Sequence, residues 1–200
     1  MRKLLLLSAV LAFGLAACTN PPRTTTTAAT YSDAIVSCAP TAVTVCNAAN
    51  ANVADGEGIL VGGVRWAATN IETPGVFAAK PGSYGGLFTW QEAENACPEG
   101  WRLPTRDELL SLAIAAVAGW VVTEDGINGR AFGTEPHQLF LPAAGFRTAA
   151  GVHRNAGIRG YYWAEGTDAV LAWFFHINRD NVTANLNDRA LGFSVRCVAR

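Results

Sequence analysis

One short stretch, residues 93–108, constrains the fold more than any other part of the chain. It reads AENACPEGWRLPTRDE and joins two helical patterns through a cysteine, two prolines and a tryptophan. Pro98 and Gly100 are residues that end a helix. Thr105, with Glu108 three residues later, has the pattern of a capping box, in which each residue's side chain accepts a hydrogen bond from the other's backbone N–H. The stretch therefore predicts a helix end, a turn and a helix start, and we expect one domain to be organised around it.

The spacing of apolar residues predicts the two helices themselves. Before the stretch, Trp90, Ala93 and Cys97 share one face of a helix expected over residues 91–96. After it, a second helix is expected to run to near Gly119 with one apolar stripe on the core. The stripe consists of Leu109, Leu112, Ala113, Ala116 and Val117.

The first residues have the pattern of an export signal. A basic start precedes an apolar run over residues 4–17 that is too short to span a bilayer. The sequence LAAC that ends at Cys18 resembles a bacterial lipobox, which implies that residues 1–17 are removed and that Cys18 carries the lipid. A plain secretory signal is the alternative. Thr19 follows Cys18, and in lipoproteins of this kind the lack of an aspartate there implies sorting to the outer membrane or cell surface, so the membrane is one expected partner.

Between the signal and the main domain the composition changes twice. Residues 18–30 are rich in threonine and proline and are expected to form a solvated tether. Residues 31–57 are small and polar and form an amino-terminal extension, which Cys38 and Cys46 could close into a short loop. The main domain is expected over residues 58–200.

The cysteines form an even set once Cys18 is assigned to the lipid. Cys38, Cys46, Cys97 and Cys197 remain, and in an exported protein they are expected to form disulfides. Three pairings are possible, and the simplest joins Cys38 to Cys46 and Cys97 to Cys197, with the second bond closing the domain. A metal site is the alternative, but no two of these cysteines have CxxC spacing.

Composition and motifs argue against several functions. A formal net charge of -1 gives the chain no general attraction for nucleic acid. His137, His153 and His176 stand alone in the sequence, without the spacing of a metal site, and no serine lies in a GxSxG context. Asp107 and Glu108 fall in the first turn of the expected helix, where acidic side chains are favoured by the helix dipole, so they do not require a catalytic role. We therefore expect no enzyme activity, no catalytic residues, no metal, no cofactor and no nucleic-acid partner.

The rest of the domain reads as short strands. Residues 58–66 predict a hairpin around Gly62 and Gly63. Beyond Trp120, apolar pieces alternate with turn residues at 138–141, 143–146, 161–164, 171–177, 181–186 and 191–198. In the strand at 171–177, alternation places Trp173, Phe175 and Ile177 on a core face and Phe174, His176 and Asn178 on a mixed face.

Six motifs occur in order along this region. They are VGGVRWA at 61–67, GLFTW at 86–90, ACPEGWRLPT at 96–105, LPAAGFR at 141–147, YWA at 162–164 and GFSVRCV at 192–198. Together they resemble the Fibrobacter succinogenes major paralogous domain, which is related to C-type-lectin-like folds. The resemblance implies an α+β domain of small twisted antiparallel sheets, two helices and long loops, with its chain ends brought together.

The same family is distantly similar to the formylglycine-generating enzyme fold. That chemistry requires two active-site cysteines that bind copper. The resemblance assigns Cys97 and Cys197 to structural positions, which leaves no such pair within the matched region.

Residues 161–191 place side chains of mixed chemistry between regular framework residues, and aromatic and arginine side chains suit binding. The candidate ligand-binding residues are Tyr161, Glu165, Asp168, Leu171, Phe174, His176, Arg179, Thr183, Leu186, Asp188 and Leu191. We expect a surface-exposed, lipid-anchored module that binds a protein or glycan, and one specific form of this hypothesis is the variable protein of a diversity-generating retroelement. The alternatives are ordinary surface variety and a structural envelope component, such as an adhesin or fimbrial subunit.

Overall fold

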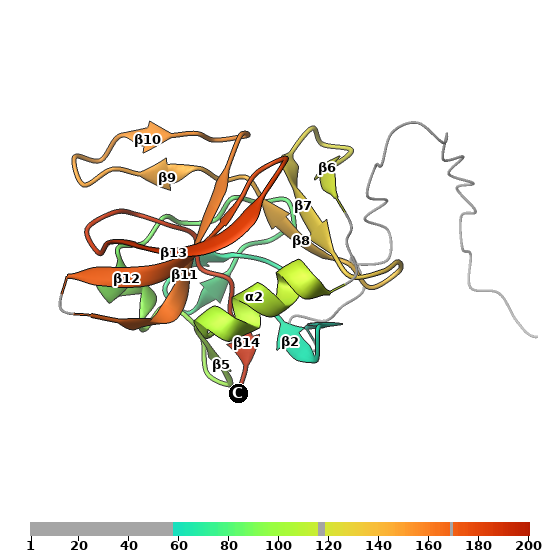
Figure 1. Ribbon diagram of the computed structural model, residues 1–200, viewed down its shortest axis with the longest axis horizontal. Helices are drawn as coiled ribbons and strands as arrows, with labels where there is room; N and C mark the ends of the chain where they lie inside the picture. The colour runs from blue at the N-terminus through green and yellow to red at the C-terminus, as the bar shows by residue number, and fades with distance from the viewer. Residues whose placement is uncertain (1–57, 116–118, 169) are drawn as a thin grey trace, which may run out of the picture. The chain divides into compact units, whose positions relative to one another are not determined.

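The computed structural model describes residues 58–115, 119–168 and 170–200 (Figure 1). The signal, the tether and the extension lie outside these residues, and so do Cys18 and the predicted pairing of Cys38 with Cys46. Within the described residues, no helix is long and apolar enough to cross a membrane.

The domain combines two helices with small antiparallel sheets, as expected for the α+β class. The helices are α1 (Trp90–Ala93) and α2 (Arg106–Ile114). The strands are β1 (Ile59–Val61), β2 (Val64–Trp66), β3 (Ile71–Thr73), β4 (Val76–Phe77), β5 (Trp101–Arg102), β6 (Trp120–Val122), β7 (Asn128–Phe132), β8 (Leu139–Pro142), β9 (Phe146–Arg147), β10 (His153–Arg154), β11 (Gly160–Thr167), β12 (Leu171–Ile177), β13 (Val182–Asp188) and β14 (Val198–Ala199).

Both helices begin at capping boxes. Thr105 and Glu108 form the predicted box at the start of α2, and Thr89 and Glu92 form a second one at the start of α1. The helices are shorter than the apolar spacing predicted. The second one ends at Ile114 because Ala115 has an extended backbone, with φ −61° and ψ 141°.

The apolar stripe of α2 is correspondingly narrow. Leu109 and Leu112 are buried as predicted, whereas Ala113 is exposed, which corrects that prediction. Ala116 and Val117 lie outside the described residues.

The predicted hairpin around Gly62 and Gly63 is confirmed as β1 and β2. Both glycines have positive φ values of 61° and 79°, a conformation that side chains with a Cβ rarely adopt. β2 pairs with β14, and β14 pairs with β5, so the sheet has the order β1-β2-β14-β5. The first strands of the domain, the last strand and residues 101–102 are thereby joined.

The largest ladder is the antiparallel sheet β11-β12-β13. α2 packs against all of its strands (Figure 1). Leu109 and Leu112 share a buried cluster with Phe175 and Ile177 of β12. The opposite face of the sheet carries a second buried cluster, which contains Trp163, Phe174 and Phe193. Alternation in β12 therefore assigns the two faces correctly. On the side expected to be mixed, a second core covers Ala172 and Phe174, whereas His176 is only half-buried.

Residues 191–198, which we call the carboxy-terminal strap, run between the sheets. Only Val198 belongs to a strand, β14, but the preceding residues make isolated bridges, from Phe193 to Phe88 and from Ser194 to Tyr162. The predicted disulfide between Cys97 and Cys197 is confirmed, with 5.9 Å between the Cα atoms.

Arg196 lies in the middle of the strap and is completely buried. Its guanidinium donates to Asn70 Oδ1 at 2.9 Å and to the carbonyl oxygens of Ala67, Ala68 and Phe140 at 3.0, 2.8 and 3.1 Å. Burial lowers the pKa of Arg196 to about 10. The strap is thus held by a covalent bond and by a buried cation whose partners come from two separate segments, residues 67–70 and Phe140.

Candidate functional site

Three of the predicted binding residues form one row across the sheet β11-β12-β13. Tyr161 pairs with His176, and His176 pairs with Thr183. Directly paired residues project from the same face of a sheet. Asn185 and Asn187 lie on this face as well, because they pair with Phe174 and Ala172. We call the surface formed by Tyr161, His176, Thr183, Asn185 and Asn187 the tyrosine–histidine face.

The Tyr161 ring is fixed by other aromatic rings. Its centroid lies 5.2 Å from that of Phe193 in a stacked arrangement and 5.1 Å from that of Phe146 in an edge-to-face arrangement. The ring also lies 5.1 Å from His176. Asn155 Nδ2 donates to the hydroxyl at 3.2 Å. The phenol is therefore held in one position.

Phe174 belongs to this cluster but is not a surface residue. Its side chain is only 6% exposed, and its ring lies 5.1 Å from Phe193 and 6.0 Å from Tyr161. The expectation that Phe174 belongs to the binding surface is wrong in this respect, because the second core covers this part of the sheet. The Phe174 ring instead packs against Tyr161 within this second core.

His176 is half-buried and has an unused polar atom. Its Nε2 atom is buried and has no hydrogen-bond partner among the described residues. Burial, and then the positive charge of Arg159, hold the pKa of His176 below its ordinary value of 6.5. The imidazole is therefore neutral at pH 7.

The outer strand β13 contributes short polar side chains to this face. Thr183 and Asn185 are exposed, and Asn185 Nδ2 donates to Thr183 Oγ1 at 3.0 Å. The sequence prediction missed Asn185 and Asn187, because asparagine is typical of turns. Their positions two and four residues after Thr183, on the same face of a strand, are the signal that could have found them.

The remaining predicted residues lie elsewhere. The strand pairing places Leu171, Leu186 and Asp188 on the opposite face of the sheet, the one that packs against α2. Asp168 Oδ1 accepts hydrogen bonds from the backbone N–H groups of Val170 and Leu171, as in a turn. Arg179 is exposed in the turn between β12 and β13, and Leu191 is half-buried at the start of the strap.

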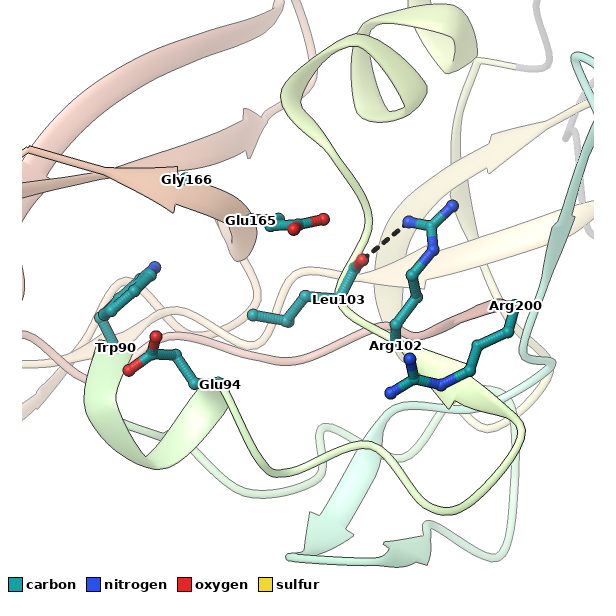
Figure 2. Close-up of a pocket in the computed structure, with 7 residues that line it drawn as sticks. All are labelled: Trp90, Glu94, Arg102, Leu103, Glu165, Gly166 and Arg200. Atoms are coloured by element: carbon teal, nitrogen blue, oxygen red, sulfur yellow. Dashed lines mark hydrogen bonds between the residues drawn. The ribbon is translucent and has the colours of Figure 1, made fainter.

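Glu165 is separated from the tyrosine–histidine face and lines a hollow of about 410 Å³ beside Trp90 (Figure 2). Glu165 lies four residues after Tyr161 on β11, beyond the buried residues 162–164. The predicted residues therefore do not form one continuous surface.

The carboxylate of Glu108 has a structural position. It accepts hydrogen bonds from both terminal nitrogens of Arg102, at 2.8 and 2.6 Å, and from the backbone N–H of Thr105 at 2.7 Å. The Arg102 hydrogen bonds, followed by the Thr105 contacts, hold the pKa of Glu108 below its ordinary value. Within residues 58–115, 119–168 and 170–200, no three His, Cys, Asp or Glu side chains come together in a group that could hold a metal ion.

The family model of the Fibrobacter succinogenes major domain matches residues 45–199. No curated protein and no solved structure matches the chain.

Proposed function

Since this chain belongs to the Fibrobacter succinogenes major domain family, we propose that it is a binding module rather than an enzyme. It is lipid-anchored through Cys18 at the outer membrane or cell surface and recognises a protein or a glycan. The tyrosine–histidine face is its recognition surface.

One observation carries this proposal: the row Tyr161–His176–Thr183 presents polar groups on a base of stacked rings. Surfaces that are already ordered lose little conformational entropy on binding, which favours affinity. A tyrosine ring offers contact area, and amide and hydroxyl groups offer hydrogen bonds in both directions.

We also propose that the domain is a C-type-lectin-like fold. The pairing of β2 with β14 joins residues at the two ends of the described domain, and the disulfide at Cys197 reinforces this closure. Both features fit the closed-end architecture of that fold. Superposition on an experimentally determined structure of this domain would test the assignment.

The retroelement form of the hypothesis applies to the same face. Tyr161, His176 and Thr183 belong to the residue types produced when adenines of asparagine codons are mutagenised, and Asn185 and Asn187 are asparagines. A near-identical repeat beside a reverse-transcriptase gene would support this form. A genomic locus with neither would refute it.

The binding proposal is tested with a glycan and surface-protein array. The full chain is applied in a detergent without a sugar headgroup, together with the double variant His176→Asn/Thr183→Ala and the control Leu60→Ala. Leu60 is exposed on β1, outside the face. We expect the double variant alone to lose the signal, and retention of binding by that variant would reject this face as the site.

The anchor is tested separately by labelling cells with a fatty acid. We expect the label on the wild-type chain and none on Cys18→Ala. Equal labelling of both chains would rule out Cys18 as the lipid site.

A structural role in the envelope is the second candidate, and the outer edge of β13 favours it. This strand is last in the sheet, and no strand within the described ranges pairs with its outer side. Such an edge can accept a strand from another chain. Size-exclusion chromatography in detergent would show a stable multimer if this candidate is right and a monomer if it is wrong.

A further inference from the structure

The hollow beside Trp90 is a second place where a ligand can be held, and it is distinct from the tyrosine–histidine face. Its walls come from α1, β5, β11 and the end of the chain. The lining residues are Trp90, Glu94, Arg102, Leu103, Glu165, Gly166 and Arg200 (Figure 2). A volume of about 410 Å³ lies in the range of sites that hold small molecules.

Hydrogen bonds between separate segments fix the walls. The Glu165 N–H donates to the Pro104 carbonyl at 2.7 Å, and the Arg200 N–H donates to the Gly100 carbonyl at 3.0 Å. Trp90 Nε1 donates to the Ala164 carbonyl at 3.3 Å. The hollow is therefore part of the rigid framework.

The charged groups of the hollow are not equally available. Arg102 is already bonded to Glu108 and to the Leu103 carbonyl. By contrast, no hydrogen bond or ion pair joins the charged groups of Glu94, Glu165 and Arg200 to the described residues, although the charge of Glu165 contributes, after the hydrogen bonds to Glu108, to raising the pKa of Arg102. Glu94, Glu165 and Arg200 are all exposed to solvent.

Two of these charges lie on opposite sides of the hollow. Figure 2 shows the carboxylate of Glu94 beside Trp90 and the guanidinium of Arg200 on the other side, with the Leu103 side chain between them, whereas the carboxylate of Glu165 lies in the middle and points toward Arg102. Trp90 and Leu103 are 5% and 6% exposed and form an apolar base. Opposite charges separated by an apolar base complement a molecule with an amine at one end and a carboxylate at the other.

We propose that this hollow binds a small zwitterion of the amino-acid or short-peptide class. The ligand amine lies at Glu94 and Glu165, its carboxylate lies at Arg200, and its apolar part covers Leu103. The amine is the stronger determinant, because Glu108 already pairs with Arg102, which leaves the two carboxylates of Glu94 and Glu165 facing the one guanidinium of Arg200. A simple anion is disfavoured by the same imbalance.

The test uses the dipeptide glycyl-leucine and two blocked forms of it. The full chain is labelled with ¹⁵N, and the indole N–H signal of Trp90 is followed during titration. We expect saturable shifts with glycyl-leucine, affinity at least about tenfold weaker for N-acetyl-glycyl-leucine, and about threefold weaker for glycyl-leucine amide, since exposed ion pairs contribute modestly.

Matched variants locate the site. Glu165→Gln should weaken glycyl-leucine binding about fivefold, while Glu99→Gln, an exposed acid outside the hollow, should leave it unchanged. Unchanged spectra elsewhere verify that both variants are folded. Equal binding of the acetylated peptide, equal effects of the two variants, or no shift at Trp90 would each overturn the proposal. None of these results depends on binding at the tyrosine–histidine face.

Discussion

The two edges of the sheet β11-β12-β13 are built in opposite ways. Beside β11, the strap residues 193–197 are all buried, and the Ser194 backbone N–H donates to the Tyr161 carbonyl at 2.9 Å. Along β13, Thr183 and Asn185 are exposed, and their side chains bond to each other. The inner edge thus carries stability, whereas residues on the outer edge can change at little cost to the fold.

The inner edge also shows how a charge can be buried without an acidic partner. Arg196 is surrounded by one amide oxygen and three carbonyl oxygens, so its donors are used although no carboxylate bonds to it. Removing such a group leaves several buried acceptors unsatisfied, which costs more than the group's own hydrogen bonds contribute.

Removing the disulfide should have the largest effect on the inner edge. The bond between Cys97 and Cys197 spans a sequence separation of 100 residues, so Cys97→Ala/Cys197→Ala should lower the free energy of unfolding by about 4 kcal/mol. Guanidinium denaturation without reductant measures the change. Reduced wild-type protein should behave like the variant, and a loss below about 1 kcal/mol would contradict the role of this bond.

Arg196→Met should have the next largest effect. We expect a loss of about 3 kcal/mol, because the carbonyls that Arg196 bonds would remain buried without donors. The matched control is Arg154→Met in the exposed strand β10, which should stay within about 0.5 kcal/mol of wild type. Equal denaturation midpoints for the two variants would show that Arg196 is not a support of the strap.

The carboxylate of Glu108 should make the stability of the protein depend on pH through the start of α2. Because its folded pKa is below the unfolded value of 4.5, its contribution is complete above pH 4.5 and is lost as the pH falls through the folded pKa. Glu108→Gln should therefore cost about 1 kcal/mol at pH 7, a figure reduced for partial exposure, and the difference from wild type should shrink at pH 3. Urea unfolding at both pH values tests this, and a constant difference would be inconsistent with it.

A smaller pH effect is expected from His176, which lies on the tyrosine–histidine face. Its imidazole should titrate with a midpoint below 6.5 in NMR spectra, because burial and Arg159 oppose protonation. The unfolded chain binds this proton more readily than the folded chain, so protonation of His176 opposes folding. The free energy of unfolding is therefore highest above pH 6.5 and falls as the pH drops toward the folded pKa. Arg159→Gln should raise the midpoint only partly, since burial is the larger cause. A midpoint above 6.5 in wild type would disprove the burial argument.

Local signals in the sequence predicted the framework well. The capping box at Thr105, the Gly62-Gly63 turn and the pairing of Cys97 with Cys197 depend on a few residues or on cysteine parity. The length of α2 was overestimated, because an apolar stripe does not encode where tertiary packing ends a helix.

Features that depend on distant contacts were missed. Alternation placed Phe174 on the correct face of β12 but could not show that Phe193 and Trp163 would bury it. Arg196 reads as a surface residue, since its acceptors lie between 56 and 129 positions away in the sequence. The same limit applies to the candidate site: spacing relates Asn185 and Asn187 to Thr183, but only the pairing of β13 with β12 shows that they share a face with His176.

If recognition is separate from the framework, a change on the outer edge should abolish binding and leave stability almost unchanged. The double variant Thr183→Ala/Asn185→Ala tests this directly. Denaturant unfolding and array binding are measured for wild type and for this variant. We predict unfolding within about 0.5 kcal/mol of wild type, because both side chains are exposed, together with loss of the array signal. An unchanged array signal, or a loss that accompanies a destabilisation of several kcal/mol, would contradict the separation of recognition from the framework.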